Sequence, residues 1–181
     1  MTRFIALLLI AFASAAAAQD CPAAPDHAAA QDSLFDALKD APGEADARIL
    51  ANELWLLWTD APDARAQALL DEGMRKREGY DFLGARDALD ELVEYCPDYA
   101  EGYNQRAFAS FLRGDFDAAL WDLDRALELN PRHLGALSGR GLTLMRLGRE
   151  DEAQEALKAA VALNPWLAER HLVRAPEGTD I

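Results

Sequence analysis

The chain has 181 residues, 51% of them hydrophobic, which is enough apolar material for one globular domain and argues against wholesale disorder. Its formal net charge is −14, and so acidic a surface repels phosphate backbones and anionic lipids, so we expect no nucleic-acid partner. Alanine, leucine, glutamate and arginine are abundant while β-branched residues are scarce, and this composition predicts an all-α fold.

Residues 1–18 have the layout of a secretory signal peptide. Arg3 supplies a positive start, an apolar run follows over residues 4–13, and small residues lead to a cleavage pattern at Ala18. The alternative is a membrane anchor, but a spanning helix needs about 20 apolar residues and this run is shorter. We therefore expect cleavage before Gln19, no stable membrane insertion afterwards, and a periplasmic or secreted protein.

The two cysteines, Cys21 and Cys96, both lie in the part that would be exported. An even number of cysteines in an oxidising compartment is a candidate disulfide. The segment after Cys21 is long enough to fold back to Cys96, since an extended chain spans about 3.3 Å per residue. Two free thiols are the alternative.

Residues 19–65 contain two predicted helices, at 31–40 and 45–60, separated by a proline–glycine turn. They form either a degenerate repeat or an N-terminal cap, and the pattern leaves both open. Trp55 and Trp58 are expected to pack this hairpin onto the unit that follows. Core packing is expected for at least three of the four tryptophans of the chain.

A repeat of 34 residues follows. Pro97, Pro131 and Pro165 stand at this spacing, and each ends a helix-like stretch. Counting back from each proline, small residues recur where two helices of one unit must approach closely, and leucines recur where units must pack together. These positions are Gly73, Ala107 and Gly141, then Ala85, Ala119 and Ala153, then Leu89, Leu123 and Leu157. Gly114 and Gly148 end the first helix of the second and third units.

On these residues the chain resembles the tetratricopeptide-repeat (TPR) family, in units at 66–99, 100–133 and 134–167. The match is best in YNQRAFASFLRGDFDAALWDLDRALELNP and loosest in the first unit, which lacks the usual glycine–aspartate turn. The resemblance implies a right-handed α-solenoid with an N-terminal helical hairpin and, in residues 168–181, a C-terminal capping helix and a tail. With the signal peptide, it indicates an exported bacterial TPR protein.

Arg106 and Arg140 stand where the commonest form of the repeat has leucine. A variant of the repeat carries arginine there, beside an acid from the second helix, and Asp122 and Asp124 are the candidates. The resemblance therefore implies structural ion pairs at these positions rather than ligand-binding residues.

No catalytic residue, metal site or cofactor is predicted. His27, His133 and His171 are far apart and lack zinc-type spacing, and no nucleotide-binding glycine motif follows a strand. His133 and His171 are expected to be surface or half-buried residues.

The resemblance also implies a binding groove lined by the first helix of each unit. Met74, Phe108 and Leu142 form an apolar row along it at 34-residue steps. The expected groove residues are Met74, Arg77, Asn104, Gln105, Phe108, Phe111, Leu142 and Met145. Such a strip accepts an extended peptide or a helix of a partner protein. The alternative is that the N-terminal helices or a second copy cover it.

The predicted function is a non-catalytic protein–protein interaction scaffold in the cell envelope or periplasm. The alternatives are a self-assembling homodimer and, with less support, an enzyme with an acidic site. Chaperone-binding TPR proteins hold a C-terminal carboxylate with lysines, asparagines and an arginine. Those places hold Leu70, Met74, Gly135 and Gly139 here, so that clamp is absent.

Overall fold

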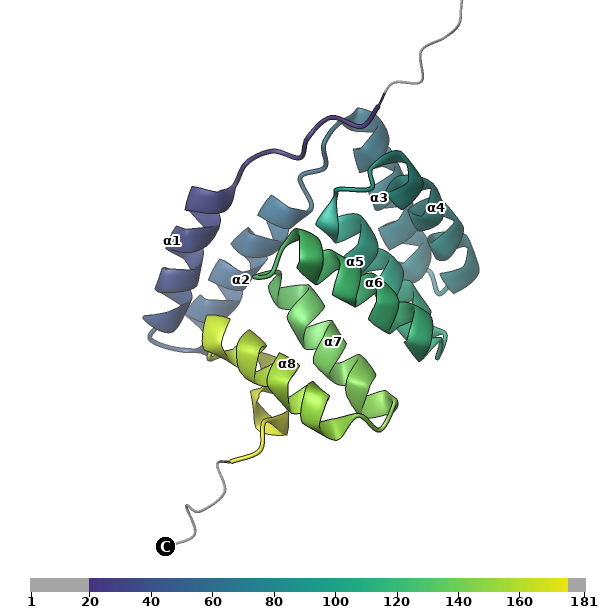
Figure 1. Cartoon of the computed structure of the whole chain (residues 1–181). Coiled ribbons are helices and arrows are strands. Elements are labelled where there is room, and N and C mark those ends of the chain that lie inside the picture. The colour runs from purple at the N-terminus through teal and green to yellow at the C-terminus, as the bar shows by residue number, and fades with distance from the viewer. Residues whose placement is uncertain (1–19, 176–181) are drawn as a thin grey trace, which may run out of the picture.

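The computed structural model describes residues 20–175, so the expected signal peptide and the last six residues lie outside the described part. The described residues form eight α-helices, a short 3₁₀ helix (η1) and no strand, and the predicted all-α solenoid is confirmed (Figure 1). The elements are α1 (Ala28–Lys39), α2 (Glu44–Trp58), α3 (Ala64–Glu78), α4 (Phe82–Tyr95), α5 (Ala100–Leu112), α6 (Phe116–Leu129), α7 (Leu134–Arg146), α8 (Glu150–Leu163) and η1 (Ala168–Leu172).

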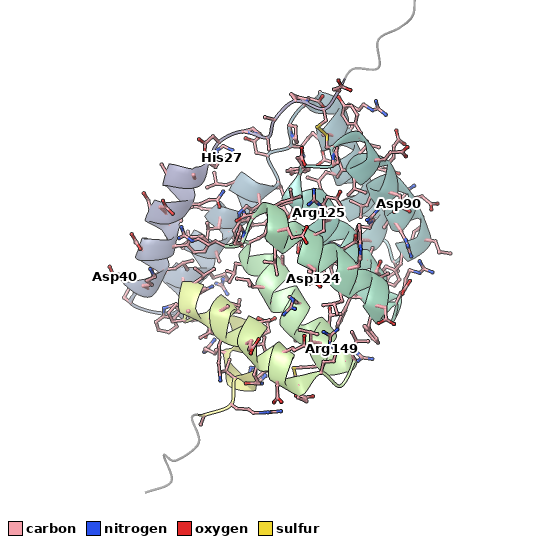
Figure 2. The ribbon with its side chains drawn as sticks, in the orientation of Figure 1. His27, Asp40, Asp90, Asp124, Arg125 and Arg149 are labelled. Carbon is pink, nitrogen blue, oxygen red and sulfur yellow. A yellow bond between two sulfur atoms is a disulfide. The ribbon has the colours of Figure 1, made fainter. Side chains whose placement is uncertain are left out.

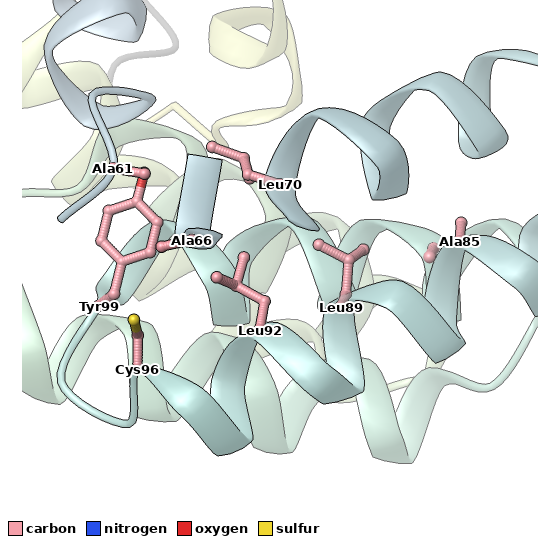
Figure 3. Packing of buried hydrophobic residues seen from close by; sticks show 9 residues of the cluster. Ala61, Ala66, Leu70, Ala85, Leu89, Leu92, Cys96 and Tyr99 are labelled. Atoms are coloured by element: carbon pink, nitrogen blue, oxygen red, sulfur yellow. The ribbon is translucent and has the colours of Figure 1, made fainter. Parts of the chain in front are cut away.

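The helices pair into three hairpins, α3/α4, α5/α6 and α7/α8, which stack in series. Within a hairpin, small residues let the two helices approach closely. A Cβ atom added at Gly73 would lie 2.6 Å from Cγ of Leu89, and one at Gly141 would lie 2.6 Å from Cγ of Leu157. Figure 3 shows the result in the first hairpin, where the leucines of α4 point toward α3. The interpretation of these small residues as points of close approach is confirmed.

The turn inside each hairpin uses one residue with a left-handed backbone. This residue is Gly114 (φ 80°) in the second hairpin and Gly148 (φ 72°) in the third. In the first hairpin it is Tyr80 (φ 62°), whose side chain is 83% exposed. A residue with a Cβ atom is strained in this region. The first unit therefore keeps the backbone turn of the other two, and its loose match comes from a tyrosine at the position of the glycine.

The N-terminal hairpin α1/α2 packs along the edge of the stack where the turns between repeats lie, and reaches the last repeat (Figure 1). One buried cluster joins Phe35, Leu54 and Trp58 of the hairpin to Leu134 of α7 and Ala160 of α8. The expectation that this hairpin packs onto the first unit is therefore wrong. The apolar faces of α1 and α2 fit the end of α8, and a five-residue linker lets the chain double back to α3.

The tryptophan expectation also fails. Trp58 is buried and Trp166 is half-buried, but Trp55 is 44% exposed and Trp121 is 61% exposed. Trp55 lies one residue after the buried Leu54, or about 100° around the helix, and this places it at the edge of the buried face. Core packing holds for two tryptophans at most.

Several polar contacts fasten the hairpin to the repeats. Arg132 pairs with Asp32, and Arg170 Nη2 lies 3.3 Å from Glu44 Oε2. The Tyr99 hydroxyl donates to the Trp58 carbonyl at 2.7 Å, and burial raises the pKa of that phenol far above its ordinary value. These contacts join residues up to 126 positions apart.

A disulfide joins Cys21 and Cys96, with the two Cα atoms 5.1 Å apart (yellow bond in Figure 2). Cys96 is the C-cap residue of α4, so the bond ties the segment before α1 to the turn between the first two repeats.

The expected C-terminal capping helix is shorter than predicted, because only Ala168–Leu172 is helical and that segment is a 3₁₀ helix. Asn164 accepts from the Trp166 N–H and turns the chain before it.

We predict that Tyr80→Gly stabilises the protein by about 1 kcal/mol, because glycine relieves the left-handed strain at some cost in unfolded-state entropy. The reciprocal change, Gly114→Tyr, should destabilise by about 1–2 kcal/mol. Urea unfolding of both variants measures the two effects. A less stable Tyr80→Gly would mean that the edge-to-face contact of Tyr80 with Phe82 outweighs the strain.

Candidate functional site

A cavity of about 250 Å³ opens between α5 and α7, on the face formed by the first helices of the hairpins. We call this face the groove. The cavity brings together four of the predicted groove residues, Asn104, Phe108, Phe111 and Leu142. Phe108 is 46% exposed, so much of its ring is accessible from outside. The lining is mainly apolar, with a few polar side chains, as is usual for binding pockets.

Gly135 and Gly139 of α7 line the cavity on the side that faces α5. A Cβ atom at Gly139 would lie 3.1 Å from Leu123 Cδ2, which leaves no room for a larger side chain without a shift. At Gly135 an added Cβ atom would lie 3.5 Å from Asn104 Nδ2. The two glycines therefore allow α7 to approach α5 and α6 closely, and the cavity lies beside them, next to Phe108 and Leu142.

The other predicted groove residues do not line the cavity. Met74 packs against the core of the first hairpin, and Met145 packs against the buried cluster of Leu120, Leu144 and Ala153. Met145 lies three residues after Leu142, and that rotation is enough to turn it toward α8. Gln105 is only 4% exposed. Gln105 is therefore not accessible as expected, whereas Met74 and Met145 are half-buried outside the cavity, and their part in binding stays a prediction.

Gln105 belongs to a buried polar network centred on Glu101, which is 1% exposed. The carboxylate accepts from Asn104 Nδ2 at 3.0 Å, from Gln105 Nε2, and from His133 Nε2, whose nitrogen lies 2.8 Å from Oε2. His133 Nδ1 accepts from the Ala136 N–H and caps α7, so the imidazole is neutral and its proton sits on Nε2. Three donors compensate the buried charge.

His133 is 1% exposed, so its expected surface or half-buried position is wrong. Its ring stacks on Trp58, with ring centroids 4.4 Å apart. The burial depends on Trp58 arriving from the N-terminal hairpin, and no spacing within the repeats encodes that contact. The signal available was a histidine at the position where α7 needs a cap.

Arg77 connects the network to the cavity. Its guanidinium donates to Gln105 Oε1 and lies over the Phe108 ring, 4.5 Å from the centroid. Burial lowers the pKa of Arg77, partly offset by the charges of Glu78 and Glu101. A guanidinium remains charged at neutral pH even so, and the contact helps to fix the Phe108 ring.

The expected ion pairs of Arg106 and Arg140 are confirmed. Arg106 makes two bonds to Asp122, at 2.9 and 2.6 Å, and a third to Asp90 at 2.8 Å. Arg140 Nε donates to Asp124 at 2.6 Å. None of these side chains lines the groove cavity. Arg106 of α5 bridges α4 and α6, and Arg140 joins α7 to α6.

The geometry of the groove offers an apolar cavity to a binding partner. Within residues 20–175 no three histidine, cysteine, aspartate or glutamate side chains are grouped to hold a metal ion. No helix in the same stretch has the length and apolar character needed to cross a membrane.

Comparison with known proteins agrees with the repeat pattern. Residues 110–172 match the profile of the tetratricopeptide repeat. A TPR repeat-containing protein of Rhizobium etli is 33% identical over 134 residues, covering 74% of this chain and 66% of the relative. The tetratricopeptide repeat protein 36 homolog of Nematostella vectensis is 38% identical over 92 residues, covering 50% of this chain and 51% of the relative. The chain thus spans less than two thirds of the length of these curated relatives.

Solved structures agree on the fold. The first TPR of Spaghetti (RPAP3), bound to an HSP90 peptide, has a TM-score of 0.58 at 24% identity and covers 60% of this chain and 86% of that one. The TPR2B domain of yeast Sti1, in complex with an Hsp70 peptide, has a TM-score of 0.57 at 23% identity and covers 61% and 90%. Together, the sequence and structure matches support the predicted TPR family.

We predict that His133→Ala destabilises the protein by about 3 kcal/mol, because it removes a helix cap and a stacked ring and leaves the buried Glu101 short of a donor. The matched control is His171→Ala, an exposed position where the change should stay within about 0.5 kcal/mol. Urea unfolding of both variants checks this. Equal effects at the two positions would mean that the buried network contributes nothing.

Proposed function

We propose that this protein, whose helical hairpins are tetratricopeptide repeats, is a non-catalytic scaffold of the cell envelope or periplasm that binds a peptide or protein in its groove. The observation that carries the proposal is the half-exposed Phe108 beside an open apolar cavity. TPR domains are protein-interaction scaffolds, and the cavity beside Phe108 is the part of the groove that can bind a side chain of a partner.

An apolar side chain of the partner would enter the cavity. Covering the exposed part of Phe108 contributes about 1 kcal/mol, and the entering side chain gains more from its own burial. Arg77 already holds the Phe108 ring, so the pocket loses little conformational entropy on binding. Interface energy usually concentrates in a few such central anchors.

The two solved TPR domains cited above are bound to peptides of HSP90 and Hsp70, and they share only the fold with this chain. Here an apolar cavity lies beside α5, lined by Phe108 and Leu142. We therefore propose a partner recognised by an apolar side chain rather than by a terminal carboxylate.

We predict that Phe108→Ala with Leu142→Ala weakens partner binding at least tenfold, which corresponds to about 1.4 kcal/mol. The partner is first identified by placing a photo-crosslinking amino acid at position 108 in the native cell. The control is Leu83→Ala, because Leu83 is 63% exposed on α4 and does not line the cavity. A collapsed melting temperature with binding unchanged would identify Phe108 and Leu142 as core residues and reject the proposal.

Export is supported by the signal-like residues 1–18 and by the Cys21–Cys96 disulfide, because disulfides persist in oxidising compartments. The intact mass of protein recovered from its native compartment should therefore begin at Gln19, with no thiol available to a labelling reagent. Full-length protein in the membrane fraction, or two reactive thiols, would contradict export.

A further inference from the structure

Helix α2 exposes an apolar stripe on the side opposite its packed face. Ala47, Leu54 and Trp58 are buried against the rest of the protein. Ile49 and Leu56 are each 58% exposed. They are seven residues apart, which places them one above the other on a helix, and Leu56 lies about 200° around the helix from Leu54.

This stripe is not explained by packing within the chain. Neither Ile49 nor Leu56 belongs to a buried cluster or packs against one among the described residues. A helix that follows the usual amphipathic pattern carries polar residues on its outer face, whereas α2 is apolar on two sides. Exposed apolar patches of this kind mark interaction sites.

Acidic residues run along one side of the stripe. Asp46 and Glu53 are also seven residues apart, both are exposed, and neither makes an ion pair within residues 20–175. The acid at the start of α2, Glu44, is by contrast paired with Arg170. Asp46 and Glu53 therefore present two uncompensated charges beside Ile49 and Leu56.

We propose that this surface, formed by Ile49, Leu56, Asp46 and Glu53, binds an amphipathic helix of a second partner protein. That helix would carry apolar residues at seven-residue spacing, flanked by lysine or arginine. This occupant follows from charge complementarity. The basic residues of the partner helix would pair with Asp46 and Glu53 while the two apolar stripes pack together, as in a coiled coil. A second copy of this chain is disfavoured, because each copy carries a net charge of −14 and an antiparallel pairing would set acids against acids.

The surface is separate from the groove, because neither α2 nor any of these four residues lines the cavity. It also has a built-in reporter. Trp55 lies next to Leu56, is 44% exposed, and would change its fluorescence when a helix covers the stripe. Binding at α2 can therefore be followed independently of binding in the groove.

The test uses the mature protein and two synthetic helical peptides of about 20 residues. Both peptides have leucine at the seam positions, and the flanking positions are lysine in one and glutamate in the other. Fluorescence anisotropy of the labelled peptides measures binding, and a change in tryptophan emission that is lost in Trp55→Phe reports that the stripe is covered. We expect the lysine peptide to bind at least tenfold more tightly than the glutamate peptide.

The variant Ile49→Gln with Leu56→Glu should weaken binding of the lysine peptide at least tenfold. Leu83→Glu is the matched control, because Leu83 is a leucine of similar exposure on α4, and this variant should bind as tightly as the unmodified protein. Phe108→Ala should also bind normally, which separates this proposal from the groove. Reversing the charges with Asp46→Lys and Glu53→Lys leaves the apolar stripe intact and should switch the preference to the glutamate peptide.

Three results would overturn the proposal. The two peptides could bind equally well or not at all, or the control variants could lose as much binding as the stripe variant. A failure of the charge reversal to switch the preference would have the same meaning. Concentration-dependent dimers in light scattering that disappear on Leu56→Glu would show instead that a second copy covers α2.

Discussion

The contact between the N-terminal hairpin and the last repeat is the constraint on which the rest of the structure depends. In a stack of three helical hairpins each repeat contacts only its neighbours, so small rotations of one repeat against the next add up along the stack. Here α1 and α2 lie across the turns between repeats and share a buried cluster with α7 and α8. The disulfide from Cys21 to Cys96 ties the same segment to the first repeat. The repeats are thereby held at both ends, and their relative rotation is restricted.

The packing of the N-terminal hairpin is connected to the groove by one ring stack and a series of hydrogen bonds. Trp58 stacks on His133, His133 donates to Glu101, and Glu101 accepts from Gln105. Gln105 in turn accepts from Arg77, which lies over Phe108. Each link is buried or half-buried, where an unpaired polar group is costly, so the members hold one another in place. The pocket beside Phe108 is consequently shaped before any partner arrives.

The spacing of 34 residues predicted the three hairpins, because the residues that set it act between helices close in sequence. Gly73 must be small for Leu89 to approach, and Arg106 finds Asp122 only 16 residues away. Half of the expected groove residues also line the cavity. The docking of α1/α2 could not be predicted, since it joins residues such as Asp32 and Arg132 that follow no common period. The buried position of His133 was missed for the same reason.

The two proposed surfaces differ in the physics that would drive binding, and this difference follows from where each lies. The cavity beside Phe108 is apolar and set between helices, so a partner there gains mainly from burial, which salt changes little. The stripe on α2 is flanked by exposed carboxylates, so a partner there gains partly from charges that salt screens within about 8–10 Å. The N-terminal hairpin packs one face of α2 against the repeats and exposes the opposite face to solvent. One short segment can therefore both hold the groove in shape and offer a separate contact.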